Sequence, residues 1–314
     1  MRLFLGITDY DWFSLHASKH LVEEVNFWRP SAETNFRALA PGEPFLFKLH
    51  APRNYIVGGG FFAKFLRLPV SLAWDSFGEA NGARSLAEVK SRISKYRNVA
   101  IGPHEDPNIG CIILVEPFFF PEPDWIPVPA AFKLNIVQGR GYGLDEEDGQ
   151  YIWRAVGERL AQIQVNRPTS SPAILAATDA ARYGRPMIVT PRLGQGAFRV
   201  MVTDIYQRRC AMTGERTLPV LEAAHIKPYA EGGVHELRNG LLLRSDLHKL
   251  FDAGYLTVDP DERRILVSRR IREEFDNGRD YYALEGRVLR DPMEVVTGPA
   301  REYLAYHADN VFRE

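Results

Sequence analysis

The chain has 314 residues, of which 45% are hydrophobic and 25% are charged. These values are ordinary for globular proteins, so they exclude a largely disordered, collagenous or low-complexity chain, and the length predicts about two domains. Lys and Arg number 39 against 40 Asp and Glu, which gives a net charge of -1 and excludes a uniformly basic nucleic-acid-binding protein. The two cysteines, Cys111 and Cys210, are too few for a disulfide framework or a four-cysteine zinc site.

The first residues place two acidic side chains, Asp9 and Asp11, where a signal peptide would have its apolar core. No stretch approaches about 18 uninterrupted apolar residues, the length that spans a bilayer. We therefore expect a soluble, cytoplasmic protein without a membrane partner.

Residues 1–148 alternate between apolar strand patterns and turn residues. Glycines 58–60 favour a bulge or a sharp corner. Apolar residues between 84 and 97 recur at spacings of three and four, which predicts a helix. Together these features favour an α+β fold whose first domain is a closed or partly closed β-barrel with a few short helices. The predicted strands are residues 3–7, 45–49, 55–57, 61–68 and 111–115, the last of them ended by Glu116 and Pro117.

The middle of the chain predicts a helix followed by a linker. Residues 148–165 carry an apolar stripe at helical spacing, and residues 166–172, NRPTSSP, have linker composition. We therefore expect a first domain at 1–148, a helix and linker at 149–185, and a second domain at 186–314. The second domain is expected to begin with a helix that buries Phe198, Met201, Val202 and Ile205.

Three polar residues of the second domain, His225, Asn239 and His248, are separated by 14 and then 9 positions. His225 follows an apolar strand-like run, Asn239 precedes a second short strand at 241–243, and Asp246 is placed to cap a helix that carries His248. The order is therefore strand, loop, strand, helix. This arrangement suits phosphodiester hydrolysis, which needs a base that activates water near neutral pH and a cation that stabilises charge on the phosphate and the departing 3′ oxygen.

The string AAHIKPYAEGG…NGLLLRSDLHKLFDAG, preceded by RLGQGAFR and CAMTG, resembles the HNH nuclease family with its ββα-metal core, in the branch found in predicted restriction endonucleases. The resemblance covers residues 190–260 and implies a metal-dependent endodeoxyribonuclease. Carried over residue by residue, it implies that His225 is the general base, Asn239 a structural asparagine and His248 a metal ligand. His235, in the same loop, is interpreted as a solvated histidine.

The expected metal site departs from the family pattern at one position. Many family members carry Asp or His directly before the base, where this chain has Ala224. We expect Mg²⁺ or Mn²⁺, held by His248 and by a carboxylate from Glu222 or Asp246. Asp252 is a further candidate, although it is interpreted first as the partner of a nearby arginine. A histidine ligand also extends the range towards Ni²⁺ or Co²⁺.

The segment from residue 182 to residue 216 holds seven arginines and two acids, so it is basic within a neutral protein, as phosphate contacts require. Double-stranded DNA is the expected partner. The residues expected to contact it are Arg192, Arg199, Arg208, Arg209, Lys227, Arg244 and Lys249.

In the first domain, the segments TDYDW, NFWRPS, PGEPFLFKLHAPRNYIVGGGFF and LAWDSFG, in this order, resemble the PUA-like barrels, most of all the EVE branch related to YTH and SRA domains. The resemblance implies that a flipped or unpaired modified base binds in an aromatic-lined pocket. Asp75 or Asp11 would read the polar edge of the base, and Trp125 is interpreted as part of a strap packed on the barrel. The candidate pocket residues are Tyr10, Trp12, Trp28, Trp74, Asp75 and Phe77.

The two resemblances together predict a modification-dependent DNA endonuclease that reads 5-methyl- or 5-hydroxymethylcytosine with its first domain and cuts with its second. One alternative is a conventional restriction or homing-type HNH nuclease. Another is a non-catalytic DNA-binding protein with a degenerate HNH fold, because Ala224 replaces a ligand. One HNH site cuts one strand at a time, so we also expect a homodimer on DNA.

Overall fold

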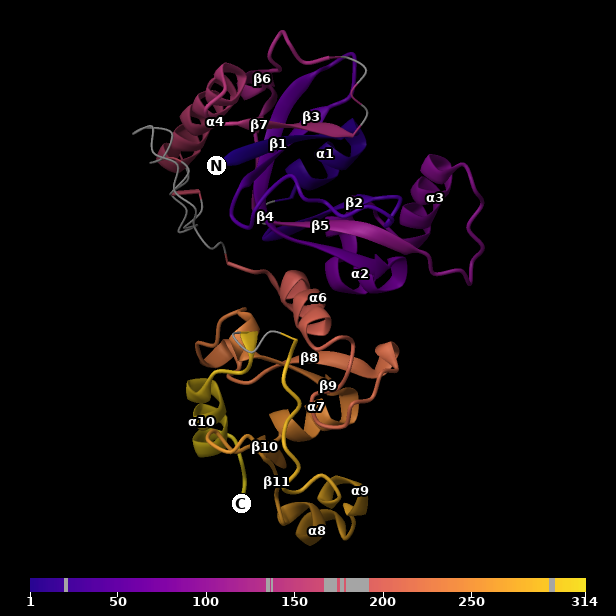
Figure 1. Ribbon diagram of the computed structural model, residues 1–314, viewed down its shortest axis with the longest axis vertical. Coiled ribbons are helices and arrows are strands. Elements are labelled where there is room, and N and C mark those ends of the chain that lie inside the picture. Colours follow the sequence, from indigo (N-terminus) through magenta and orange to yellow (C-terminus); the bar gives the residue numbers. More distant parts are fainter. Residues whose placement is uncertain are drawn as a thin grey trace. The chain divides into compact units, whose positions relative to one another are not determined.

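The computed structural model describes residues 1–19, 22–133, 136, 138–166, 174–175, 178, 192–293 and 297–314 (Figure 1). These residues form two compact units, Met1–Gly194 and Gln195–Glu314. The linker predicted at 166–172 lies, apart from its first residue, outside the described residues. No helix within the described ranges is both long and apolar enough to cross a membrane.

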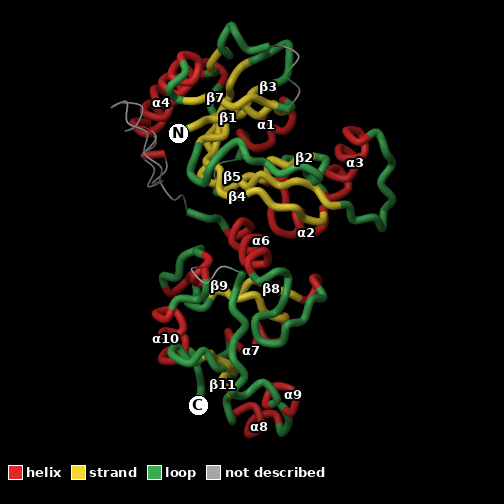
Figure 2. Tube along the Cα trace, viewed as in Figure 1, coloured by secondary structure: helices red, strands yellow, loops and turns green. Residues whose placement is uncertain are grey.

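The first unit is built around a seven-stranded mixed sheet (Figure 2). Strand β1 pairs in parallel with β3, and the other neighbouring strands are antiparallel. The strands are β1 (Arg2–Thr8), β2 (Glu24–Arg29), β3 (Pro44–Leu49), β4 (Tyr55–Pro69), β5 (Asn108–Phe119), β6 (Ile126–Pro127) and β7 (Gly139–Gly143).

This sheet is open, so the expectation of a closed barrel is wrong. The strand order is β2-β5-β4-β3-β1-β7, with β6 beside β4, and among the described strands β2 and β7 do not pair to close a ring. Closure depends on stagger and pairing between residues far apart in the sequence, which local strand patterns do not encode.

Strand β4 contains the bulge expected at glycines 58–60. The separate strands predicted at 55–57 and 61–68 join through these glycines into one strand, and the pairing register with β3 and β5 shifts beside them. A Cβ atom on Gly58 would lie 2.3 Å from the carbonyl oxygen of Phe118, so this close approach of two strands requires glycine.

Strand β5 continues to Phe119 instead of ending at Glu116. Glu116 adopts a positive φ of 49°, which bends the strand without ending it. The helices α3 (Leu86–Arg97) and α4 (Glu147–Asn166) confirm the two helices predicted in this part of the chain.

The core of the first unit is strongly aromatic. Helix α1 (Tyr10–Ala17) buries Trp12 and Phe13 against β2, β3 and β5, where Trp12 meets Phe27 and Phe47 edge to face. A second short helix, α2 (Val70–Phe77), is followed by the 3₁₀ turn η1 (Gly78–Asn81). Trp125 packs on Phe13, as expected of a strap.

The second unit holds the strand–loop–strand–helix order that the sequence predicted. Strand β8 (Leu221–His225) pairs with β9 (Gly240–Arg244), and α7 (Ser245–Asp252) packs against both strands (Figure 1). The other elements are α6 (Gln195–Ile205), β10 (Leu256–Val258), β11 (Ile265–Val267), α8 (Arg270–Phe275), α9 (Arg279–Tyr282) and α10 (Arg301–Asn310).

The core of the second unit lies where α6, α7 and the β8–β9 pair meet. All four apolar residues predicted to line α6 are buried, which confirms that helix and its buried face. Leu241, Leu242 and Leu243 are fully buried on β9, and Leu247 and Phe251 cover them from α7. Burial of each such side chain stabilises the fold by ~1.5–3 kcal/mol. The β8–β9 strands and α7 therefore form a stably packed scaffold that holds the polar side chains at its edge.

Candidate active site

His225 ends strand β8 and is held on two sides. Its ring stacks on Phe198 of α6, with centroids 4.0 Å apart and planes 11° from parallel. Its Nε2 lies 2.8 Å from Nδ1 of His235. Burial, followed by the charges of His235 and His248, lowers the pKa of His225 to about 4. The ring is therefore neutral at neutral pH and has a lone pair with which to accept a proton.

Asn239 fixes the loop between β8 and β9. Its side chain is fully buried at the end of the 3₁₀ turn η5 (Leu237–Asn239). Its Oδ1 accepts a hydrogen bond from the backbone N–H of Lys227 (2.8 Å), and its Nδ2 donates to the carbonyl oxygens of Lys227 (3.0 Å) and Val234 (3.1 Å). Three of the four hydrogen-bonding positions of the amide are thus used to close the loop.

His248 lies between two carboxylates. Its Nδ1 is 2.7 Å from Oε2 of Glu222 on β8, and its Nε2 is 3.3 Å from Oδ2 of Asp252, one turn further along α7. Burial raises the pKa of Asp252, the charge of His248 lowers it, and the negative charge of Glu222 raises it further. Two acids that share one imidazole form a negatively charged pair, which favours a bound cation.

The side chains of Glu222, His248 and Asp252 suit a divalent ion chemically, because carboxylate and imidazole are both common metal ligands. Each ring nitrogen of His248 faces a different carboxylate, so the trio does not surround one point. Accordingly, within the described parts of the chain no three His, Cys, Asp or Glu side chains converge as a ready metal site. Ala224, at the position where the family pattern places a second ligand, is fully buried.

Asp246 has a different partner from the one expected of a ligand or a helix cap. The residue at the cap position of α7 is Arg244, and both carboxylate oxygens of Asp246 accept hydrogen bonds from its guanidinium, at 2.6 and 2.7 Å. The bond to Arg244 lowers the pKa of Asp246. Asp252, interpreted as the partner of an arginine, pairs instead with His248.

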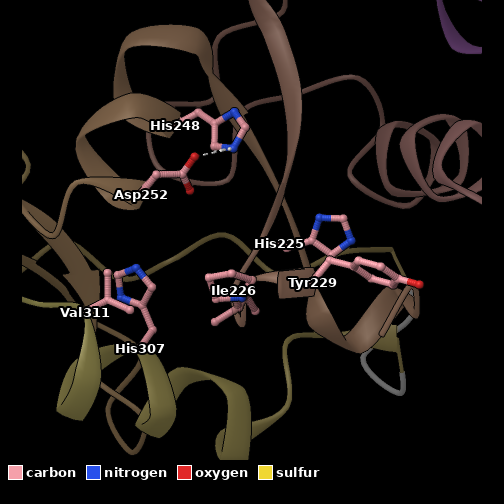
Figure 3. A pocket seen from close by; sticks show the side chains of 8 residues that line it. His225, Ile226, Tyr229, His248, Asp252, His307 and Val311 are labelled. Atoms are coloured by element: carbon pink, nitrogen blue, oxygen red, sulfur yellow. Dashed lines mark ion pairs between the residues drawn. The ribbon is translucent and has the colours of Figure 1, made fainter. Parts of the chain in front are cut away.

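A cavity of about 370 Å³ brings several of these side chains together (Figure 3). His225 and His248 line it from β8 and α7, and Asp252 lies beside His248, to which a dashed line joins it. The C-terminal helix α10 contributes His307. The remaining residues of the lining are Ile226, Pro228, Tyr229 and Val311.

His235 contacts the candidate base, and sequence reasoning missed this contact. His235 is half-buried, bonded to His225 and stacked on Tyr229 with centroids 4.7 Å apart, so its interpretation as a solvated loop histidine is wrong. The available signal was the presence of a second histidine between the candidate base and Asn239. Loop residues have no periodicity from which their direction could be read.

The candidate DNA-contacting residues are spread over several elements. Arg192 belongs to the first compact unit, and Arg208 and Lys249 are exposed in the second. The Lys227 ammonium lies over the ring of Tyr306, 4.5 Å from its centroid. Arg199 and Arg209 are half-buried, and Arg244 is paired with Asp246. Arg182 and Arg185 of the basic segment lie outside the described residues.

The candidate pocket residues of the first unit do not form one open wall. Trp12 and Phe77 are 5% and 6% exposed, so both belong to the packed interior rather than to a surface pocket. The Trp28 indole donates to the carbonyl oxygen of Asn81 at 2.8 Å. Tyr10 is exposed beneath the Arg53 guanidinium. Trp74 is half-buried, whereas Asp75 and Asp11 are exposed.

Buried polar atoms without partners lie close to this aromatic core. His16 is fully buried between Trp12 and Phe119, and neither ring nitrogen has a hydrogen-bond partner. Oδ1 of Asn26 is likewise unpaired, although its Nδ2 donates to Asn81. Burial lowers the pKa of His16 to about 3, with a smaller contribution from Lys19.

Residues 210–259 match a family model described as HNH endonuclease. The match includes β8, β9, α7 and the polar residues described on them. Among solved structures, the chain is similar to the crystal structure of a ZmASCH mutant protein from Zymomonas mobilis, with 11% identity and a TM-score of 0.32 over 48% of this chain and 95% of that one. No curated protein matches the chain.

Proposed function

We propose that the second unit, whose HNH endonuclease segment indicates a nuclease acting on DNA, hydrolyses a phosphodiester bond with His225 as the general base. The observation that carries this proposal is the meeting of His225 and His248 at one cavity. Water gives a proton to His225 while its oxygen bonds to phosphorus. The P–O3′ bond breaks, and O3′ takes a proton from solvent. A positioned base of this kind contributes ~10²–10⁴-fold to the rate.

We propose that His248 and Asp252 hold the divalent ion, with Nε2 of His248 as the ligand atom. Glu222 would then accept the hydrogen bond from Nδ1–H and orient the ring, as second carboxylates do in many metal sites. When bound, the ion, Mg²⁺ or Mn²⁺ with Ni²⁺ or Co²⁺ as further candidates, would supply positive charge that stabilises the phosphate. Because Asp246 is engaged with Arg244, we assign it no ligand role.

The test is nicking of supercoiled plasmid by the full chain, with Mg²⁺, Mn²⁺, Ni²⁺ or Co²⁺ and with excess EDTA. We expect cutting only with metal, and a loss of at least about 100-fold in the His225→Ala variant. The matched control is His104→Ala, which replaces an exposed histidine of the first unit. Nicking by His225→Ala at the rate of the control would remove the assigned base. If the parent chain binds DNA but never cuts it with any of the four metals, the non-catalytic alternative replaces the proposal.

We further propose that the first unit reads a modified cytosine, which would make the chain a modification-dependent endonuclease. The supporting observation is the set of unpaired polar atoms on His16 and Asn26 within an aromatic core, because a base is recognised by stacking and by hydrogen bonds to its edge. Trp28 is half-buried and donates to the carbonyl oxygen of Asn81, the residue whose side chain accepts from Asn26.

Plasmids that carry cytosine, 5-methylcytosine or 5-hydroxymethylcytosine test this assignment. We expect the full chain to cut a modified plasmid faster, and Trp28→Ala to erase the difference by removing a stacking contact worth ~1–3 kcal/mol. Trp74→Ala tests the second half-buried tryptophan in the same way. Equal cutting of all three plasmids would favour a conventional nuclease.

We also propose that two copies act together on duplex DNA, since one site cuts one strand. Linear product should then appear with a rate that rises more steeply than the first power of enzyme concentration. A strictly first-order rate, with nicked circles accumulating fully before linear product, would favour a single copy.

A further inference from the structure

His235 reaches the candidate base through a loop whose shape is fixed on both sides. The Nδ2 of Asn239 donates to the carbonyl oxygen of Val234, the residue directly before His235. The backbone N–H of Glu236, directly after it, also donates to that carbonyl, at 2.9 Å. A Cβ on Gly233 would lie 2.1 Å from the carbonyl oxygen of Lys227, so the loop folds back tightly at this point. The position of His235 is therefore set by the loop.

Aromatic rings hold the two histidines from both ends. Phe198 stacks on His225 at 4.0 Å and also contacts His235 at 5.7 Å. Tyr229 stacks on the other ring, His235, with planes 11° from parallel. The rings follow in the order Phe198, His225, His235, Tyr229, and the 2.8 Å contact between Nε2 of His225 and Nδ1 of His235 joins the middle two. A ring that tilted out of its plane would lose a stacking contact, so the planes of both histidines are fixed.

The direction of this hydrogen bond decides whether His225 can act as a base. A neutral imidazole carries one proton and one lone pair. If His235 donated, His225 would carry its proton on Nδ1, and the lone pair on its Nε2 would accept the bond from His235. No lone pair would then remain to accept a proton from water. If His225 donates from Nε2, its lone pair lies on Nδ1, the ring nitrogen that does not take part in the bond to His235.

We propose that His235 is a positioning residue for the base: its Nδ1 accepts the Nε2–H of His225 and so leaves Nδ1 of His225 to take a proton from water. This inference rests on the proposed function. During hydrolysis water gives one proton to Nδ1, its oxygen bonds to phosphorus, and the P–O3′ bond breaks with its electron pair on O3′, which is protonated by solvent. The proton on Nε2 stays in place, and its bond to His235 strengthens as the ring becomes cationic.

Two variants of nearly equal shape separate this role from a purely structural one. In His235→Asn the amide Oδ1 stands near the former Nδ1 and accepts the same bond, whereas His235→Leu fills the same space without an acceptor. In the full chain, we expect His235→Leu to lower the single-turnover rate of plasmid nicking by at least about 10-fold, because a base in the wrong tautomer is inactive. His235→Asn should recover most of the rate. The affinity for a labelled duplex should be unchanged in both.

A spectroscopic measurement tests the tautomer without using activity. The chain has 8 histidines, and the ring signals of His225 in a long-range ¹H–¹⁵N spectrum are identified by their loss in His225→Ala. We expect His225 as the Nε2–H tautomer in the parent chain and as a mixture of tautomers in His235→Leu. Melting temperatures of the variants control for folding.

Three results would overturn the inference: an Nδ1–H tautomer in the parent chain, a parent-like rate in His235→Leu, or no difference between Asn and Leu at this position. They are distinguishable from failure of the proposed function, which is read from His225→Ala. If His225→Ala is inactive and His235→Leu is fully active, His225 keeps its assignment as the base and only the positioning role of His235 is rejected. If His225→Ala itself cuts normally, the proposed function fails first.

Discussion

The two compact units differ in whether the ring nitrogens of a buried histidine have hydrogen-bond partners. In the unit Gln195–Glu314, His307 is 1% exposed and both ring nitrogens are paired, Nδ1 with the Thr257 hydroxyl at 2.8 Å and Nε2 with the Phe251 carbonyl at 3.1 Å. In the unit Met1–Gly194, His16 is fully buried and neither nitrogen has a partner. The same side chain therefore stabilises one unit and costs stability in the other.

This difference bears on how each unit could work. A paired polar group costs little and holds its neighbours in place, and His307 ties α10 to α7 and β10 at the edge of the cavity. An unpaired buried group costs about 1–3 kcal/mol. A bound base edge would supply partners to such atoms, which is the reason for placing the proposed base recognition around His16.

The largest effect is expected at Asn239. Its replacement by alanine leaves the Lys227 N–H and the Lys227 carbonyl without partners, at about 1–3 kcal/mol for each group that stays buried, and leaves the Val234 carbonyl with the Glu236 N–H alone. The second unit should lose ~3–5 kcal/mol in urea unfolding. Nicking should fall at least as far as in His235→Leu, because the same loop carries His235. Asn310→Ala, on the exposed end of α10, is the control and should change stability by less than about 0.5 kcal/mol. A change in Asn239→Ala no larger than in the control would contradict the role of the amide in fixing the loop.

The sequence predicts the local parts of this site well. Strands β8 and β9 were predicted from apolar runs and helix α7 from a capping residue, and all three lie where expected. The partners of polar side chains are harder to predict. Asp246 looked like a cap or a ligand and pairs with its neighbour Arg244, and His235 looked solvated and touches the base. Both outcomes depend on side-chain direction in loops and at helix ends, which residue spacing does not specify.

The first unit shows the same limit on a larger scale. Its strands and helices were mostly predictable, whereas the open sheet was not, since closure depends on pairing between distant strands. Trp12 was expected in a pocket because the segment TDYDW resembles the PUA-like barrels. In an eight-residue helix only one face is exposed, and the direction of Trp12 is decided by packing against Phe27 and Phe47.

A matched pair of phenylalanine variants tests the comparison of the histidines directly. At pH 7.5, His307→Phe should destabilise the second unit by about 1–3 kcal/mol, because the buried Thr257 hydroxyl loses its ring partner and the Phe251 carbonyl keeps only the Gly254 N–H. His16→Phe should stabilise the first unit by about 1 kcal/mol, since it removes two unpaired nitrogens and keeps the ring. Urea unfolding of the full chain gives both values. Equal signs for the two variants would show that the pairing of the ring nitrogens does not determine stability.

The pH dependence of stability sharpens the same comparison. In the unfolded chain His16 binds a proton near its ordinary pKa of 6.5, whereas in the folded unit it does so only near a pKa of about 3. The free energy of unfolding is therefore unaffected above pH 6.5 and falls as the pH drops from 6.5 towards 3, by about 1.4 kcal/mol per pH unit. The advantage of His16→Phe over the parent chain should grow by about 2 kcal/mol between pH 7.5 and pH 5. An advantage that is the same at both pH values would mean that His16 is not held neutral by burial.

The smallest effect is expected at Lys249, which is exposed on α7 next to His248. If this side chain contacts one phosphate, Lys249→Ala should lower the slope of log affinity against log salt by about 0.9 and weaken binding to all duplexes alike. Lys95→Ala, an exposed lysine at the end of α3 in the first unit, is the matched variant. A change confined to Lys249 would mean that α7 contacts the DNA backbone and α3 does not. Equal changes in the two variants would mean that DNA contacts both units, and no change in either would exclude both helices from the phosphate-binding surface.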